Sequence, residues 1–146
     1  MRRIMVEASL CDGCMKCVDA CGKRREGTLT GGIPFDEKKQ AACFVRKSRT
    51  GDFIPLVCRQ CILPACLTAC MSGALSRSEE SGHIRYDLER CASCFMCVMN
   101  CPYGMPKPAG GTEKGVIRCD FCMDSCDIPD CVAACTKGAI YIGEVL

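Results

Sequence analysis

Apolar and polar residues alternate over several short stretches of this chain, and the positions of these stretches predict its strands. After Cys70, and again after Cys135, a Gly-Ala-aliphatic step leads into an alternating segment, which is typical of a short β-strand. The pair Ser81-Gly82 predicts a tight turn between strands at 74–77 and 83–86. Strands this short need something that cross-links them.

Two further segments complete the predicted pattern. A second hairpin is predicted over 42–57 around Thr50-Gly51-Asp52, and the segment 105–111, rich in Pro and Gly, is predicted to be a loop. No apolar stretch approaches the roughly 18 residues of a membrane span, so we expect no direct membrane insertion. The 146 residues include no Trp, only 5% are aromatic, and 18 are Cys. An ordinary apolar core is therefore not what we expect to hold the chain together.

The use of the cysteines depends on the compartment. No apolar segment of signal-peptide length precedes Cys11, and the pair Arg2-Arg3 is not interpreted as a twin-arginine signal. We therefore expect a cytoplasmic protein, in which thiols stay reduced. Metal ligation is then favoured over a disulfide scaffold.

The cysteines form an internal repeat of four motifs. Each motif opens with Cys-x-x-Cys and closes with two cysteines four residues apart. The four motifs are CDGCMKCVDAC (11–21), CRQCILPACLTAC (58–70), CASCFMCVMNCP (91–102) and CDFCMDSCDIPDCVAAC (119–135).

This spacing suits cubane iron–sulfur clusters, whose four irons each take one Cys thiolate. The first three cysteines of a motif supply three corners of one cluster. If the closing step is a helical turn, the last cysteine lies about 6 Å further along the same face and is placed to reach a second cluster. Such exchanges pair the motifs, so four motifs predict four clusters, which use sixteen of the 18 cysteines. Zinc is the alternative, but zinc sites combine two Cys-x-x-Cys pairs and have little use for a third cysteine such as Cys17 or Cys97.

At these motifs, and over nearly its whole length, the chain resembles the four-cluster electron-transfer subunits related to the beta subunits of dimethyl sulfoxide reductase and respiratory nitrate reductase. Smaller relatives serve carbon monoxide dehydrogenase, formate dehydrogenase, hydrogenase and tungsten aldehyde oxidoreductase. The resemblance implies an α+β fold, a single polyferredoxin domain over 1–146 with two bacterial-ferredoxin-like (βαββαβ-type) halves around four 4Fe-4S clusters. The outer half is expected from 1–40 plus 112–146, and the inner half from 53–111.

The resemblance also implies which cysteines share a cluster, because the first motif of that family pairs with the fourth and the second with the third. The implied sets are Cys11, Cys14, Cys17 with Cys135; Cys119, Cys122, Cys131 with Cys21; Cys58, Cys61, Cys66 with Cys101; and Cys91, Cys94, Cys97 with Cys70. Some relatives hold a three-iron cluster in place of the third-motif cluster because one cysteine is replaced, but Cys94 is present here.

One feature departs from the family pattern, and another leaves the identity of one cluster ligand undecided. A proline follows the last cysteine of a motif only at Pro102. Cys126 is an alternative to Cys131 as a ligand, and Cys131 is favoured because it preserves the four-residue step to Cys135. Cys43 is interpreted as a small buried hydrophobic residue and not as a ligand.

Complete ligation leaves no iron open to a substrate, so the motifs favour electron transfer over catalysis. A domain of this length has a radius of gyration of about 15 Å, which puts four clusters in a row at steps of roughly 10 Å. No catalytic triad, phosphate loop or dinucleotide fingerprint is present. We expect a non-catalytic electron carrier that serves the catalytic subunit of a low-potential anaerobic oxidoreductase of the carbon monoxide dehydrogenase, formate dehydrogenase, hydrogenase or aldehyde oxidoreductase type. A redox- or oxygen-sensing regulatory module is the alternative, and self-association into a longer wire is a further hypothesis.

Charge changes this picture in one respect. Ligation removes sixteen thiol protons from the formal charge of +2, and four oxidised cores add eight positive charges, so the loaded protein carries a net charge of about −6. Basic runs are then expected to offset this charge or simply to be solvated, and they give no support to nucleic-acid binding. The runs are Lys23-Arg24-Arg25, Lys38-Lys39 and Arg46-Lys47-Ser48-Arg49.

The sequence also leads to expectations about its histidine and about the methionines beside the motifs. The only histidine, His83, is expected to be exposed near a turn. An apolar shell that excludes water from the clusters is expected from the methionines next to the cysteines, namely Met15, Met71, Met96, Met99 and Met123.

Overall fold

The computed structural model describes residues 1–25, 40–110, 114–124 and 127–145, and its helices and strands are short. No helix of the described residues is long and apolar enough to cross a membrane. The strands are β1 (Arg2–Val6), β2 (Phe44–Lys47), β3 (Phe53–Leu56), β4 (Leu75–Arg77), β5 (Ile84–Tyr86), β6 (Lys107–Pro108), β7 (Val116–Ile117) and β8 (Ile140–Glu144). The helices are the 3₁₀ helix η1 (Ala8–Leu10) and α1 (Lys16–Lys23), α3 (Ala65–Thr68), α4 (Met96–Asn100) and α5 (Asp130–Ala133).

The strands of the described part form four antiparallel pairs, β1–β8, β2–β3, β4–β5 and β6–β7. The pair β1–β8 joins the two ends of the chain, with Arg2 opposite Glu144 and Val6 opposite Ile140. Beyond the strands, the N-terminal ammonium of Met1 donates a hydrogen bond to the carbonyl of Val145 at 3.0 Å. The two ends of the chain therefore support each other.

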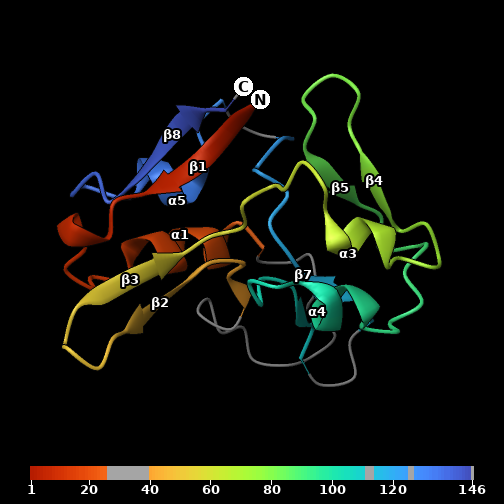
Figure 1. Cartoon of the computed structure of the whole chain (residues 1–146), viewed down its shortest axis with the longest axis horizontal. Helices are drawn as coiled ribbons and strands as arrows, with labels where there is room; N and C mark the ends of the chain where they lie inside the picture. The colour runs from red at the N-terminus through yellow and green to blue at the C-terminus, as the bar shows by residue number, and fades with distance from the viewer. Residues whose placement is uncertain (26–39, 111–113, 125–126, 146) are drawn as a thin grey trace.

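Figure 1 shows the elements in two groups. The strands β1 and β8 lie with α1 and α5 on one side, whereas α3, α4, β4, β5 and β7 lie on the other. Within the groups, α1 packs against α5 and α3 packs against α4. The hairpin β2–β3 lies beside α1 in the first group. Helices that carry the first and fourth motifs are thus neighbours, as are those that carry the second and third.

The predicted hairpins are confirmed, and one predicted loop is partly wrong. Strands β2 and β3 flank the predicted turn around Gly51, and β4 and β5 flank the turn at Ser81-Gly82. Within 105–111, however, Lys107 and Pro108 form β6 and pair with β7. The β7 residues Val116 and Ile117 are buried, and this apolar strand holds the Pro-rich segment against the core. Residue 111 lies outside the described residues.

The core around β1 and β8 combines aliphatic and aromatic side chains with cysteines. Its buried members are Ile4, Cys17, Val18, Ala41, Cys43, Val57, Phe121, Cys131 and Ile140. Because three of these nine residues are cysteines and one is alanine, this core contributes less hydrophobic stabilisation than one of large aliphatic and aromatic residues alone.

Candidate iron–sulfur cluster sites

The opening Cys-x-x-Cys loops of all four motifs share one backbone feature. The residue immediately before the second cysteine has a positive φ in each, and these residues are Gly13 (75°), Gln60 (46°), Ser93 (53°) and Phe121 (62°). Positive φ is uncommon for residues other than Gly. A turn of this kind directs successive backbone N–H groups into one concavity, which is a feature of many anion and iron–sulfur sites. The loops are therefore shaped to surround a negatively charged group.

Hydrogen bonds within the loops repeat as well. The amide of Ser93 donates to Sγ of Cys91, and the amide of Phe121 donates to Sγ of Cys119, each at 3.4 Å. In the first and fourth motifs an Asp follows the first cysteine, and its carboxylate accepts from the amide of the second cysteine. These bonds join Asp12 to Cys14 at 3.1 Å and Asp120 to Cys122 at 2.9 Å.

The closing step of each motif begins in a helix, as the spacing predicts. The third cysteine lies in α1, α3, α4 or α5 in turn. The first and third motifs enter their helices through residues in the left-handed conformation, Met15 and Phe95. The second and fourth enter through prolines, Pro64 and Pro129. The first and third motifs therefore share one kind of helix entry, and the second and fourth share the other. Each pair of helices that pack together, α1 with α5 and α3 with α4, combines the two kinds.

Three cavities in the described part are each lined by one complete predicted set of four cysteines. The first is lined by Cys11, Cys14, Cys17 and Cys135, the second by Cys21, Cys119, Cys122 and Cys131, and the third by Cys58, Cys61, Cys66 and Cys101. Cys58 also lines the second cavity and Cys119 the third, so these two cavities adjoin.

In the fourth predicted set, Cys97 lies in α4, which packs against α3. Burial raises the pKa of the Cys97 thiol, and Cys66, Cys70 and Cys91 lie near enough to raise it further. Cys70 of the second motif is therefore close to Cys97 of the third. Cys94 is exposed. Cys126, the alternative to Cys131, lies outside the described residues. The assignment of all sixteen cysteines to particular clusters stays a prediction.

The cysteines fit cubane clusters better than single metal ions. Among the described residues, no group of three or more His, Cys, Asp or Glu side chains is arranged to hold one metal ion. A structural zinc needs four ligands converging at about 2.0–2.3 Å from one point. Cubane ligands instead stand around a larger core, and each of the three cavities is lined by four cysteines of one predicted set. No disulfide joins two cysteines of the described part.

Burial sets the acid–base properties of several of these thiols. It raises the pKa of Cys58 and Cys66, raises that of Cys119 well above its usual value, and raises that of Cys122 to about 12. Such thiols are protonated at neutral pH when no metal is bound. Iron must displace these protons when it binds, so cluster binding supplies the free energy that ionises the buried cysteines.

Cys43 is buried, as predicted, and it also contacts predicted ligands. Its thiol donates a hydrogen bond to the carbonyl of Cys17 at 3.5 Å, and the amide of Ala42 donates to Sγ of Cys21 at 3.3 Å. Hydrogen bonding from Cys43 lowers the pKa of Cys17 to about 7 and that of Cys21 to about 6. The pKa of Cys43 itself is raised by its thiol neighbours Cys131, Cys17 and Cys21. Cys43 therefore keeps its proton and acts as a donor between the first two cavities.

Two expectations about the surroundings of the motifs are wrong. His83 is not exposed: it is 4% exposed, its ring stacks on Phe121 with 4.0 Å between ring centres, and Nε2 lies 2.8 Å from the carbonyl of Arg2. Met71 and Met99 are 83% and 70% exposed, so they do not exclude water from a cluster. Met15 and Met123 are partly buried against the core, as expected.

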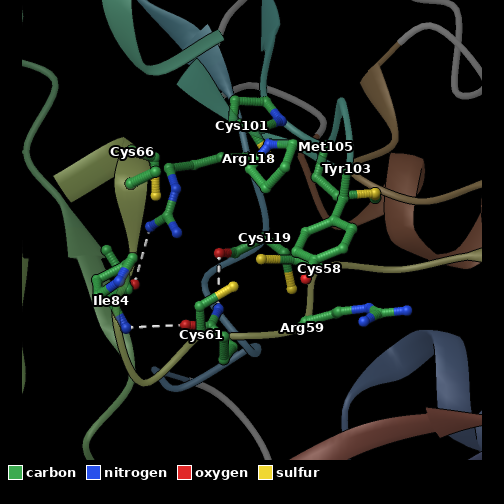
Figure 2. Close-up of a pocket in the computed structure, with 15 residues that line it drawn as sticks. Cys58, Arg59, Cys61, Cys66, Ile84, Cys101, Tyr103, Met105, Arg118 and Cys119 are labelled. Atoms are coloured by element: carbon green, nitrogen blue, oxygen red, sulfur yellow. Dashed lines mark hydrogen bonds between the residues drawn. The ribbon is translucent and has the colours of Figure 1, made fainter. Parts of the chain in front are cut away.

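Gln60 and Arg118 are buried polar residues at the third cavity that sequence reasoning missed. The Gln60 side chain donates to the carbonyl of Cys119 at 3.0 Å and accepts from the amide of Ile84 at 2.9 Å. It thereby ties the second motif to the fourth. Arg118 lines the same cavity, and Figure 2 shows its side chain among the labelled cysteines of this site. No sequence signal distinguishes these two residues from solvated polar ones.

Comparison with known proteins agrees with this chemistry. The 4Fe-4S dicluster domain family matches residues 49–145 of the chain. The chain belongs to this family. A 4Fe-4S cofactor is therefore established, which excludes the zinc alternative as the principal use of the cysteines.

Several curated proteins are similar to most of the chain. The polyferredoxin-like subunit of aliphatic sulfonate oxidoreductase from Pyrococcus furiosus is 32% identical over 90% of this chain and 70% of its own length. The beta subunit of NADH-dependent phenylglyoxylate dehydrogenase from Aromatoleum evansii is 32% identical over 94% of this chain and 29% of its own length. The iron-sulfur subunit of nitrate-inducible formate dehydrogenase from Escherichia coli is 29% identical over 95% and 53%, respectively. The chain thus spans only 29% of the phenylglyoxylate dehydrogenase subunit and 53% of the formate dehydrogenase subunit.

A solved structure shares the fold. A chain of the active site complex BamBC of benzoyl coenzyme A reductase, in complex with benzoyl-CoA, superposes with a TM-score of 0.51 over 98% of this chain and 79% of that chain. At 19% identity this likeness concerns the fold alone. Taken with the sequence relatives, which are iron–sulfur subunits of oxidoreductases, the family supports electron transfer and not the regulatory alternative.

Proposed function

We propose that this chain carries four 4Fe-4S clusters in a row and transfers electrons along them to or from the catalytic subunit of an oxidoreductase. The observation that carries the proposal is the meeting of cysteines from two motifs at each of three cavities. Each cluster, when bound, accepts and returns one electron. The protein holds the clusters, excludes water from them and sets the distances between them.

The proposed ligand sets follow the pairing of the motifs. Three cysteines of one motif and the last cysteine of its partner hold each cluster, with the sets Cys11, Cys14, Cys17 and Cys135; Cys21, Cys119, Cys122 and Cys131; Cys58, Cys61, Cys66 and Cys101; and Cys70, Cys91, Cys94 and Cys97. The packing of α1 on α5 and of α3 on α4 supports this exchange. It also supports two ferredoxin-like halves, an outer one from 1–40 plus 112–146 and an inner one from 53–111.

The proposed order of the clusters is supported by shared residues. Cys43 forms hydrogen bonds with Cys17 of the first set and Cys21 of the second, which supports placing the first cluster next to the second. Cys58 and Cys119 each line both the second and third cavities, so the step between the two halves lies there. The contact of α3 with α4 joins the third set to the fourth. An electron entering at one end of this row leaves at the other after three short steps.

The relatives support a catalytic partner. Their names describe subunits of a sulfonate oxidoreductase, a phenylglyoxylate dehydrogenase and a formate dehydrogenase. We infer a redox enzyme subunit as partner for this chain as well, in an anaerobic cytoplasm. Anaerobic purification of the chain from its own organism, followed by identification of the co-purifying subunit, tests this part.

The cluster count and the exchange of ligands have a direct test. Anaerobically purified protein is expected to contain about sixteen irons and sixteen acid-labile sulfides per chain, and the reduced protein is expected to give four separable midpoint potentials by electron paramagnetic resonance. Cys135→Ser is expected to perturb the same midpoint as Cys14→Ser, and a different one from Cys122→Ser in its own motif. Cys43→Ser is the matched control and keeps all sixteen irons. About eight irons, or a common effect of Cys135→Ser and Cys122→Ser, would contradict the proposal.

A further inference from the structure

Arg118 is a buried cation without a carboxylate partner in the described part of the chain. It is 3% exposed, its Nη1 donates to the carbonyl of Ile84 at 2.9 Å, and its Nε is buried without a hydrogen-bond partner. The neighbouring basic residues differ, because Arg24 pairs with Asp130 and Arg25 with Asp120, each at 3.9 Å. Arg118 takes part in no ion pair of the described residues.

A charge in this position needs compensation. An arginine cannot release its proton, and a buried ion that lacks a counter-charge costs several kcal/mol. The carbonyl of Ile84 supplies one hydrogen bond but no negative charge. Something else in the protein must therefore balance the guanidinium.

Arg118 lines two cavities. In one of them Asp120 and Asp124 are accompanied by the cations Arg25 and Arg85, and no carboxylate of the described residues forms an ion pair with Arg118. The other is the third cavity, where cysteines surround it. Arg118 lines this cavity with Cys58, Cys61, Cys66 and Cys101, and Figure 2 shows its guanidinium directed toward Cys66 and Ile84. Burial raises the pKa of Cys58 and of Cys66, and the positive charge of Arg118 opposes this increase at both. The cation therefore already favours the thiolate forms of two predicted ligands.

We propose that Arg118 is the buried counter-charge of the cluster held by Cys58, Cys61, Cys66 and Cys101, and that it raises the reduction potential of this cluster above the value it would otherwise have. The inference rests on the ligand set given under Proposed function. A cubane with four thiolates carries a net charge of −2 when oxidised and −3 when reduced. A fixed cation stabilises the more negative form more strongly, and burial protects the interaction from dielectric and salt screening.

Its place in the row gives this charge a role. The third cavity adjoins the second, where the proposed path crosses from one half of the protein to the other. A raised reduction potential of the third cluster means that an electron in the row is held preferentially on this cluster, next to the step between the two halves. Arg118 is a positioning residue in this sense, because it acts on the electron through the cluster and not by contact with a substrate.

The test is a redox titration of the anaerobically loaded protein, followed by electron paramagnetic resonance. Arg118→Met keeps an unbranched side chain and removes the charge. One midpoint potential is expected to fall by at least 59 mV, which is a tenfold change in the equilibrium constant for one electron, while the other three move less. Arg118→Lys is expected to retain more than half of the effect, because it keeps the charge.

Arg59 provides a matched control at the same cavity. It is an exposed cation next to Cys58 and lines the same cavity. Arg59→Met is expected to change the equilibrium constant less than threefold, because water screens the exposed charge. If Arg118→Met loses iron, Arg118→Gln replaces it, since glutamine can still donate to the carbonyl of Ile84.

Three results would overturn the inference. These are an unshifted potential in a neutral variant that retains sixteen irons, a rise in potential, or an equal shift in Arg59→Met. Failure of the proposed function is recognised separately, because the wild-type protein would then contain fewer than sixteen irons or fewer than four midpoints.

Discussion

Gly13 offers a sharp test of how the first cluster loop is held. A Cβ atom added to Gly13 would lie 2.6 Å from Cδ1 and Cε1 of the Phe53 ring, and Gly13 has a φ of 75°. The other three motifs carry Gln60, Ser93 and Phe121 at this position, all with positive φ. Left-handed backbone therefore does not by itself require Gly here. We attribute the requirement to the Phe53 ring, which the hairpin β2–β3 places over the loop.

The expected cost of Gly13→Ala has two parts. The left-handed conformation costs a residue with a side chain about 1–2 kcal/mol. Overpacking against a ring held by the hairpin costs about 1–3 kcal/mol more. In a protein that also carries Phe53→Ala the second part disappears, so the coupling between the two substitutions is about 1–3 kcal/mol, or about 5- to 150-fold in a rate.

The measurement is the rate at which the visible cluster absorbance is lost in guanidinium under anaerobic conditions. Rates are appropriate because a cluster that has left does not return, so unfolding is irreversible. Gly51→Ala is the control for backbone conformation alone, because Gly51 has a φ of 98° and no atom within 4 Å of an added Cβ. The reasoning is refuted if Gly13→Ala accelerates cluster loss no more than Gly51→Ala does, or by the same factor with and without Phe53.

Three further predictions concern buried groups around the cavities. Cys43→Ala is expected to retain the full iron content of the wild-type protein, because Cys43 donates a hydrogen bond to the carbonyl of Cys17 and is not among the predicted ligands; a loss of about four irons in metal analysis would contradict this. Gln60→Ala leaves the amide of Ile84 and the carbonyl of Cys119 without their partner, which costs about 1–3 kcal/mol per buried group, so cluster loss in guanidinium is expected to accelerate at least tenfold. Burial lowers the pKa of His83 below 6.5, so protonation at acid pH favours the unfolded chain and the stability contributed by neutral His83 is lost as pH falls below 6.5. The difference in thermal midpoint between the wild-type protein and His83→Gln, followed by cluster absorbance, is therefore expected to shrink from pH 7.5 to pH 5.5, and a constant difference would show that His83 is not titrating.

The cysteine spacing predicted local structure well because the requirement is local. A loop that surrounds a cluster must turn within four residues, and a closing step of four residues suits a helical turn. The helices that begin at Lys16, Ala65, Met96 and Asp130 therefore appear where the motifs place them. The two hairpins were predictable for the same reason, since Gly51 and Ser81-Gly82 mark their turns.

The remaining features depend on distant contacts, which a local pattern does not contain. His83 is adjacent to a turn, but Phe121 and the carbonyl of Arg2 cover it from remote parts of the chain. Met71 follows a motif cysteine directly and is nevertheless exposed, because the residue after the helical turn faces away from the core. Gln60 and Arg118 are polar side chains in a motif or beside one. Only the packing of the second motif against the fourth makes them interior residues.

Several features of the structure are energetically unfavourable, and nothing in the described polypeptide alone compensates them. Three residues other than Gly hold a positive φ before the second cysteine of a motif, and burial raises the pKa of five predicted ligands. Arg118 is buried and forms no ion pair with a carboxylate of the described residues. Strained and charged groups persist only where the surroundings compensate them. A 4Fe-4S cluster compensates all three kinds, because it accepts hydrogen bonds from the turned amides, ionises the thiols and supplies negative charge. The free energy of cluster binding is then part of the folding free energy, and removal of the iron is expected to unfold the loops and the cysteine-containing core together.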